Sequence, residues 1–108
     1  MLTLYGLPTC PDCNRALKAL GAAGREVVFR DVRAEPLSEA ERSMLLAEFG
    51  DRIIDRTTNT WRGLTEWVRQ SEAEEQLRSN PALMARPVIC EGTTMTLGWD
   101  STAQKVWL

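Results

Sequence analysis

Histidine is absent from the 108 residues of this chain. Its absence excludes Ser-His-Asp and Cys-His catalysis and removes the commonest zinc ligand, so a nucleophile must be activated by helix geometry and by cations. The formal net charge is -2, so the chain lacks the excess of positive charge that is typical of proteins that bind nucleic acids or anionic membrane surfaces. No apolar run approaches the ~20 residues of a membrane-spanning helix. We therefore expect a protein that binds neither nucleic acid nor a membrane.

Length and composition describe one ordinary globular domain. Of the 108 residues, 44% are hydrophobic and 26% are charged, which suffices for a core without disulfide staples. The first strand pattern begins at Met1 and no basic leader precedes it, so we expect a cytoplasmic protein, and we expect it to be a monomer. Thiols stay reduced in the cytoplasm, so cysteines that lie close together there are more often catalytic or metal-binding than structural.

Two of the three cysteines stand where a strand pattern gives way to a helical one. A short apolar run over residues 2–5 precedes Cys10, and a helical pattern extends from about Pro11 to Ala23. At a helix N-terminus, unpaired amide N–H groups and the helix dipole favour a thiolate on Cys10. Cys13 lies one turn further on the same face, within reach of an adduct on Cys10. We interpret the pair as a redox dithiol.

Other residues bear on this interpretation. A zinc site would need two further ligands, and without histidine only Cys90 or carboxylates could supply them, so no metal is expected. Cys90 fits better as a buried strand residue than as a redox partner, because free cysteine packs as a small hydrophobe. Asp12 opposes a thiolate by its like charge, whereas the helix terminus favours one. Arg15 is better explained as an exposed helix residue than as a partner of the thiols.

The rest of the chain alternates strand and helix patterns. We predict a second strand over 26–32, capping boxes at Ser38–Glu41 and Ser71–Glu74 in a helical middle, strands over 86–90 and 94–97, and a last helix capped by Asp100 or Ser101. The first two strands and their helix form a βαβ unit with parallel strands, and the last two strands form an antiparallel hairpin. This order, β-α-β, helices, β-β-α, predicts an α/β fold, a thioredoxin-like sandwich with a mixed four-stranded sheet. We expect a single domain, 1–108, with a helical insertion at about 37–84.

Several groups of residues, spread along the chain, match the pattern of one known protein family. They are Tyr5-Gly6 before the Cys10-x-x-Cys13 pair, Asp31-Val32-Arg33 with Pro36-Leu37-Ser38, Thr60-Trp61-Arg62-Gly63-Leu64, Asn80-Pro81-Ala82-Leu83 running into Arg86-Pro87-Val88, and Leu97-Gly98-Trp99-Asp100. In this order they resemble the arsenate reductase/Spx family of thioredoxin-fold proteins, of the glutaredoxin-coupled arsenate reductase type. The Thr60-Trp61-Arg62 segment is most similar to the small uncharacterised, reductase-like members of that family.

The resemblance implies roles for individual residues. Cys10 matches the family's nucleophilic cysteine, and Cys13 matches the second cysteine of the Spx branch, whose CxxC is a redox switch. Arg86 matches an arginine that helps to bind the oxyanion in the reductases, and Pro87 matches their typically cis proline. The residues that we expect to bind substrate are Arg86, Pro87, Arg56 and Thr9.

Two departures from the family pattern concern the oxyanion. The reductases carry a second arginine shortly after the position of Ile54, and Arg56 is about one residue displaced from it. Their third arginine falls on Trp99. An oxyanion site that loses one or two of three cations is weaker, which argues against arsenate as the natural substrate.

Two functions follow from these residues and the resemblance. In the first, Cys10 attacks a disulfide, a glutathione mixed disulfide or an oxyanion such as arsenate, and Cys13 attacks the resulting adduct. Such a thiol-dependent reductase holds no bound cofactor and draws electrons from glutathione or a glutaredoxin. The alternative is an Spx-like redox-switch regulator that binds a protein partner such as RNA polymerase. We favour the reductase.

Overall fold

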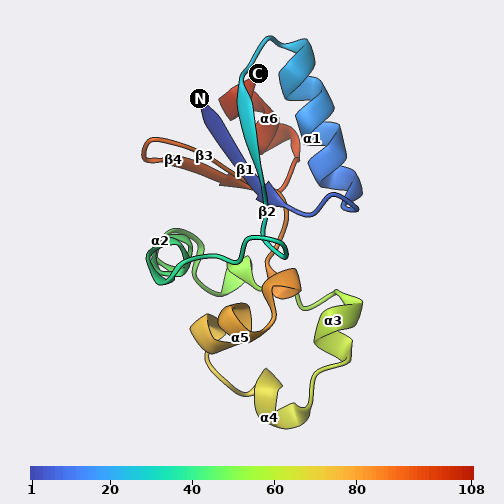
Figure 1. Cartoon of the computed structure of the whole chain (residues 1–108), viewed down its shortest axis with the longest axis vertical. Helices are drawn as coiled ribbons and strands as arrows, with labels where there is room; N and C mark the ends of the chain where they lie inside the picture. The colour runs from blue at the N-terminus through green and yellow to red at the C-terminus, as the bar shows by residue number, and fades with distance from the viewer. The chain divides into compact units, whose positions relative to one another are not determined.

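The computed structural model describes all residues from 1 to 108, which divide into two compact units. The first unit comprises residues 1–31 and 86–108, and the second comprises residues 32–85. Figure 1 shows the helices and strands of each along the chain. None of the helices combines the length and the apolarity that a membrane crossing requires.

The first unit is built on a four-stranded sheet. Its elements are β1 (Leu2–Gly6), α1 (Pro11–Ala22), β2 (Val27–Asp31), β3 (Val88–Glu91), β4 (Thr94–Leu97) and α6 (Ser101–Trp107). The strands lie in the order β2-β1-β3-β4, and β1 pairs parallel to β2 and antiparallel to β3, while β3 pairs antiparallel to β4. These pairings confirm the predicted βαβ unit, the C-terminal hairpin and the mixed sheet of an α/β fold.

Both helices of this unit pack on one core cluster. Its buried members are Leu2, Leu4, Cys13, Ala16, Leu20, Ile89 and Trp107. Within α1, the spacing of Cys13, Ala16 and Leu20 puts all three on one helical face. Each fully buried leucine side chain stabilises the fold by about 1.5–3 kcal/mol through its removal from water. Cys13 is therefore a core residue as well as half of the dithiol.

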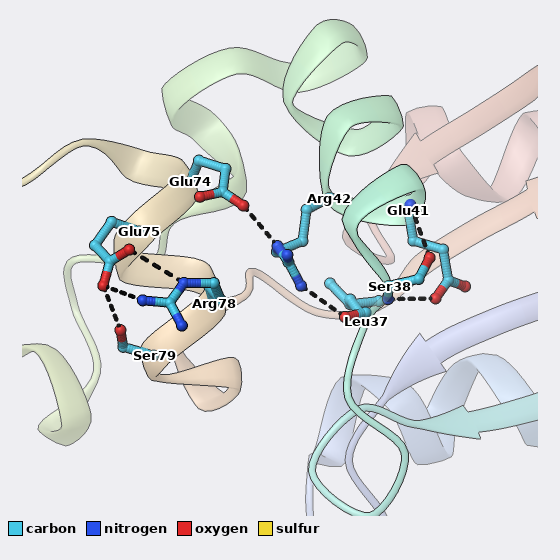
Figure 2. A network of polar contacts seen from close by, with 8 residues as sticks. All are labelled: Leu37, Ser38, Glu41, Arg42, Glu74, Glu75, Arg78 and Ser79. Atoms are coloured by element: carbon cyan, nitrogen blue, oxygen red, sulfur yellow. Dashed lines mark hydrogen bonds and ion pairs between the residues drawn. The ribbon is translucent and has the colours of Figure 1, made fainter.

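The second unit is helical. Its elements are α2 (Glu39–Phe49), the 3-10 turn η1 (Gly50–Ile53), α3 (Asn59–Arg62), α4 (Glu66–Arg69), α5 (Ala73–Ser79) and the 3-10 turn η2 (Pro81–Leu83). The predicted capping box at the start of α2 is confirmed, because Ser38 N–H donates to Glu41 Oε1 (2.9 Å) and Glu41 N–H donates to Ser38 Oγ (3.1 Å), as Figure 2 shows. A β-bridge between Ile54 and Met84 joins two segments of this unit.

Arg42 links α2 to α5 by an ion pair and to the chain before α2 by a hydrogen bond. In Figure 2, Arg42 points from α2 to Glu74 in α5, with Nε 2.8 Å from the carboxylate, and it also donates to the Leu37 carbonyl (2.8 Å). Arg78 pairs with Glu75 one turn earlier in α5 (2.6 Å). The Arg42 side chain is mostly buried, so its bonds fix the packing of α2 on α5 more firmly than an exposed pair would.

The capping box predicted at Ser71–Glu74 is wrong. Helix α5 begins after Glu72, whose side chain makes no capping hydrogen bond. The Ser71 hydroxyl instead donates to the Val68 carbonyl (2.6 Å), and the buried Gln76 amide donates to three backbone carbonyls at the junction of α4 and α5. Because these bonds close the end of α4, the Ser71 side chain does not cap α5.

Candidate redox site

Cys10 is the N-cap residue of α1. Its backbone is extended (φ -80°, ψ 119°), its amide donates to the Leu7 carbonyl (3.1 Å), and its carbonyl accepts from the Asn14 N–H (3.1 Å). Its Sγ accepts a hydrogen bond from the Cys13 N–H (3.4 Å), where a serine or aspartate oxygen commonly serves as the cap. A thiolate makes such a bond more strongly than a thiol does. Cys10 is half-buried, so its sulfur has both a fixed position and access to solvent.

Cys13 lies beneath it in the core, with no exposed surface. The pKa of the Cys13 thiol is raised to about 12, chiefly by burial and also by the hydrogen bond and charge of Cys10, while the hydrogen bond from the Leu7 N–H and the charge of Arg86 act in the opposite direction. At neutral pH this side chain is therefore a thiol and not a thiolate. The site pairs one accessible sulfur with one sulfur that keeps its proton.

Gly6, at the end of β1, makes room for the buried thiol. A Cβ at this position would lie 2.3 Å from Cys13 Sγ, far inside van der Waals contact. The Leu7 N–H, one residue on, hydrogen-bonds the same sulfur. Sequence reasoning gave neither residue a role, although a glycine at the last strand position before a CxxC was a usable signal of close approach.

The strand β3 brings Arg86 and Pro87 to the same end of the sheet. Tyr5 lies opposite Val88 in the antiparallel pair of β1 and β3. The residues that precede Val88 therefore lie beside the end of β1, from which the loop to Cys10 starts. The sheet topology thus places the start of β3 beside the end of β1, although the two segments lie far apart in the sequence.

The peptide bond between Arg86 and Pro87 is cis, as the resemblance implied. The Pro87 carbonyl accepts from the Gly98 N–H (2.8 Å), which joins the start of β3 to the end of β4. The charge of Arg86 lowers the pKa of Cys13, so this guanidinium acts on the dithiol electrostatically. Arg86 therefore lies close enough to Cys13 for its charge to act on that thiol, and Pro87 follows it at the start of β3.

The turn before α1 carries the remaining nearby residues. Thr9 lies in an exposed turn, which Asn14 fastens by donating from Nδ2 to the Pro8 carbonyl (3.1 Å). Asp12 forms an ion pair with the exposed Arg15, which confirms the surface position expected for this arginine. The pair also offsets the negative charge that Asp12 brings close to the thiols.

Three other candidate residues are placed differently. Arg56 belongs to the second unit, where its guanidinium carbon lies 5.3 Å from the centroid of the Trp61 ring. Trp99 packs half-buried against the same core cluster as Cys10. Cys90 lies in β3 as a free thiol, which confirms its predicted place in a strand, but it is half-buried and not buried as predicted.

The arrangement supports the chemistry of two thiols. All three cysteines are free, and no group of three Cys, Asp or Glu side chains gathers closely enough to hold a metal ion. An accessible cysteine at a helix N-terminus, backed by a buried thiol one turn along, is suited to attack a disulfide and then to be released by its neighbour.

The sequence of this chain is similar to one family model and to several known proteins. Residues 2–54 match the glutaredoxin family model. The chain is 30% identical over 105 residues to an uncharacterised protein of Haemophilus influenzae, which spans 93% of this chain and 92% of that protein. It is 28% identical over 106 residues to the global transcriptional regulator Spx of Listeria innocua, which spans 93% of this chain and 81% of that protein.

Solved structures confirm the thioredoxin-like fold. The YffB (PA3664) protein superimposes with a TM-score of 0.90 at 24% identity, over 100% of this chain and 99% of that one. An arsenate reductase (ArsC) related protein from Brucella melitensis superimposes with a TM-score of 0.76 at 23% identity, over 98% of this chain and 92% of that one.

Proposed function

We propose, since this chain belongs to the arsenate reductase/Spx family of thioredoxin-fold proteins, that it is a thiol-dependent reductase. The observation that carries the proposal is the dithiol itself, with an accessible Cys10 as the N-cap of α1 above a buried Cys13. Cys10 is the nucleophile and Cys13 is the resolving thiol. Glutathione or a glutaredoxin in the cytoplasm is the electron donor.

The reaction proceeds by two exchanges. The Cys10 thiolate attacks one sulfur of a substrate disulfide, a mixed disulfide forms on Cys10, and the other substrate sulfur leaves as a thiolate. Cys13 then gives up its proton and attacks the Cys10 sulfur, which releases the second substrate thiolate and leaves a Cys10–Cys13 disulfide. Two electrons have passed to the substrate. Two thiols of glutathione, or the dithiol of a glutaredoxin, restore the pair and become a disulfide themselves.

A disulfide or glutathione mixed disulfide is the proposed substrate class, ahead of an oxyanion such as arsenate. Arg86 is the cation whose charge reaches the dithiol, and Trp99 stands at the position that carries an arginine in the family's reductases. The reacting sulfur of a disulfide carries no charge and needs no cluster of cations around it, whereas a multiply charged oxyanion does. Thr9, Pro87 and Arg56 remain proposed contributors to substrate binding.

A second function is supported by the similarity to Spx over most of the chain. In this alternative the Cys10–Cys13 pair is a redox switch, and its oxidation changes the affinity for a protein partner such as RNA polymerase. Both functions begin with oxidation of the Cys10–Cys13 pair. In the reductase the pair is reduced again and reacts with further substrate, whereas in the regulator the oxidised pair changes the binding of a partner.

The test is an assay of mixed-disulfide reduction and arsenate reduction with glutathione and a glutaredoxin. We expect Cys10→Ser to abolish activity, because the nucleophile is lost, and Cys13→Ser to slow turnover and accumulate an adduct on Cys10 visible by mass spectrometry. Cys90→Ser is the matched control and should retain activity. If the wild-type chain turns over neither substrate, yet its oxidation changes binding to RNA polymerase, the regulator is correct and the reductase is not.

A further inference from the structure

The strand β2 forms an open edge of the sheet, and its outward hydrogen-bonding groups follow from the register. Leu2 lies opposite Val27, and the Leu2 N–H donates to the Glu26 carbonyl (3.0 Å). The backbone groups of the even-numbered residues of β2 therefore point to β1, whereas the N–H and C=O of Val27 and Phe29 point away from the sheet. Such a row of outward groups is a template for another strand.

The side chains along this edge are apolar at the centre and charged at both sides. Val28 keeps 46% of its surface exposed in the middle of the strand. Glu26 precedes it by two residues and Arg30 follows it by two, so both lie on the same face of β2 as Val28. The side chain of Glu26 has no hydrogen-bond or ion-pair partner within the chain, and Arg30 lies over the ring of Tyr5 on that face (5.8 Å).

We propose that β2 is an interface between two copies of this chain, which pair edge to edge and antiparallel about a two-fold axis at Val28. In this register Val28 meets Val28 of the second copy. Glu26 then meets Arg30 of the second copy, and Arg30 meets Glu26 of the second copy. The strand is complementary to itself in charge, as a two-fold interface requires.

The backbone supports the same register. With the axis at Val28, Val27 of each copy lies opposite Phe29 of the other, and both residues have outward N–H and C=O groups. Each such pair exchanges two hydrogen bonds. The two Val28 residues form a non-hydrogen-bonded pair, the type in which opposing side chains come closest. Apolar contact is therefore greatest where the exposed apolar side chain lies.

Neighbouring registers fail on charge. An axis at Phe29 sets Arg30 of each copy against Val28 of the other. An axis at Val27 sets Glu26 of each copy against Val28 of the other. Of the three registers, only the axis at Val28 places Glu26 and Arg30 opposite each other, where opposite charges are favourable. Charge complementarity thus selects one register.

The pairing should be weak and reversible, because only a five-residue strand from each copy takes part. The monomer expected from the sequence is then the dilute form of the protein. This association is independent of the redox chemistry, since it uses no cysteine.

Sedimentation velocity under reducing conditions, from micromolar to millimolar protein, tests the proposal. We expect the average mass of the wild-type chain to rise towards twice the chain mass. In Glu26→Arg, two arginines face each other at both ends of the interface, so the dissociation constant should rise about tenfold or more. Combining Glu26→Arg with Arg30→Glu restores opposite charges in the same register and should return the dissociation constant to within about threefold of wild type.

Glu48→Arg is the matched control, because it makes the same charge change at an exposed position of α2; it should associate as wild type does. Far-ultraviolet circular dichroism checks that every variant is folded. The proposal is overturned if the wild-type chain stays a single copy at millimolar concentration, if the folded double variant fails to recover association, or if the control weakens association as much as Glu26→Arg does.

Discussion

At the scale of single residues, Cys13 belongs both to the hydrophobic core and to the dithiol. Burial holds its pKa near 12 and keeps the thiol protonated at neutral pH, while Leu7 and Arg86 pull that pKa down. In the proposed reaction, the resolving step has to remove a proton from a sulfur whose pKa is high. The rate of this attack depends on geometry, because the Cys13 sulfur attacks from the position in which the fold holds it.

Gly6→Ala should disturb that position. The new Cβ would lie 2.3 Å from Cys13 Sγ, so the thiol or the strand has to move, at a cost of about 1–3 kcal/mol in the free energy of unfolding. We expect release of the first thiol from a chromogenic aromatic disulfide to keep its rate, because Cys10 is unaffected, and release of the second to slow about tenfold or more. Stopped-flow absorbance in a single turnover separates the two phases.

Gly21→Ala is the control for this substitution, since a Cβ there meets nothing within 4 Å. Alanine should leave both phases unchanged and raise stability by a few tenths of a kcal/mol to about 1 kcal/mol. Equal slowing of both phases in Gly6→Ala would contradict a specific role of the glycine in placing Cys13.

At the scale of secondary-structure elements, hydrogen bonds at helix ends decide where each helix begins. Ser38 has the sequence pattern of a capping box and forms one, and Asp100 caps α6 by accepting from the Ala103 N–H (2.9 Å). Ser71 has the same pattern as Ser38 but bonds backwards to Val68. The difference is that Ser71 directly follows another short helix, whose last carbonyls compete for its hydroxyl.

Ser38→Ala should lower the free energy of unfolding by about 1 kcal/mol, because the Glu41 N–H at the start of α2 loses the Ser38 hydroxyl that caps it. Ser43→Ala, at an exposed position inside the same helix, should raise it by a few tenths of a kcal/mol through better helix propensity. Urea unfolding followed by circular dichroism measures both. If Ser38→Ala raised the free energy of unfolding, the cap would contribute nothing to stability.

At the scale of the whole molecule, the two units divide the expected site. The two cysteines, Thr9, Arg86 and Pro87 belong to the unit with the sheet, whereas Arg56 belongs to the helical unit. Both cysteines of the proposed reaction therefore belong to one unit. The proposed edge-to-edge association also uses that unit alone, through β2.

The stability of the molecule should fall at alkaline pH because of Cys13. Unfolding returns its pKa from about 12 to the ordinary value of 9.0. Between these values the folded state holds a proton that the unfolded state has lost, so the stabilisation is fully present below pH 9 and is lost as pH rises towards 12. The slope from this one proton is at most about 1.4 kcal/mol per pH unit.

Urea unfolding in the presence of a reductant, at pH 8 and at pH 10.5, measures this loss. We expect the wild-type chain to lose more stability between the two pH values than Cys13→Ala does, because the variant lacks the titrating thiol. Cys90→Ala should follow the wild type. A Cys13→Ala variant with the same pH dependence as wild type would show that the buried thiol does not govern alkaline stability.

Some features of this protein were determined by the sequence alone, because they depend on neighbours within one or two turns. The apolar pattern of Ala16, Leu17 and Leu20 predicted α1, and the placement of Cys10 before Pro11 predicted a thiol at its N-terminus. Hydrogen bonds from residue i to i+4 and the period of two in strands are local, so the order of the elements could be read without the fold.

Other features were decided only by tertiary structure, because they depend on contacts between distant segments or on which strand lies at an edge. The pairing of β1 with β3 brings Arg86 and Pro87 beside the end of β1, from which the loop to Cys10 starts. The approach of Gly6 to Cys13 depends on how α1 packs on β1, and the self-complementary charges of β2 acquire meaning only because this strand lies at the sheet's edge. Local patterns carry no information on these contacts, since the side chains involved meet only after the chain has folded.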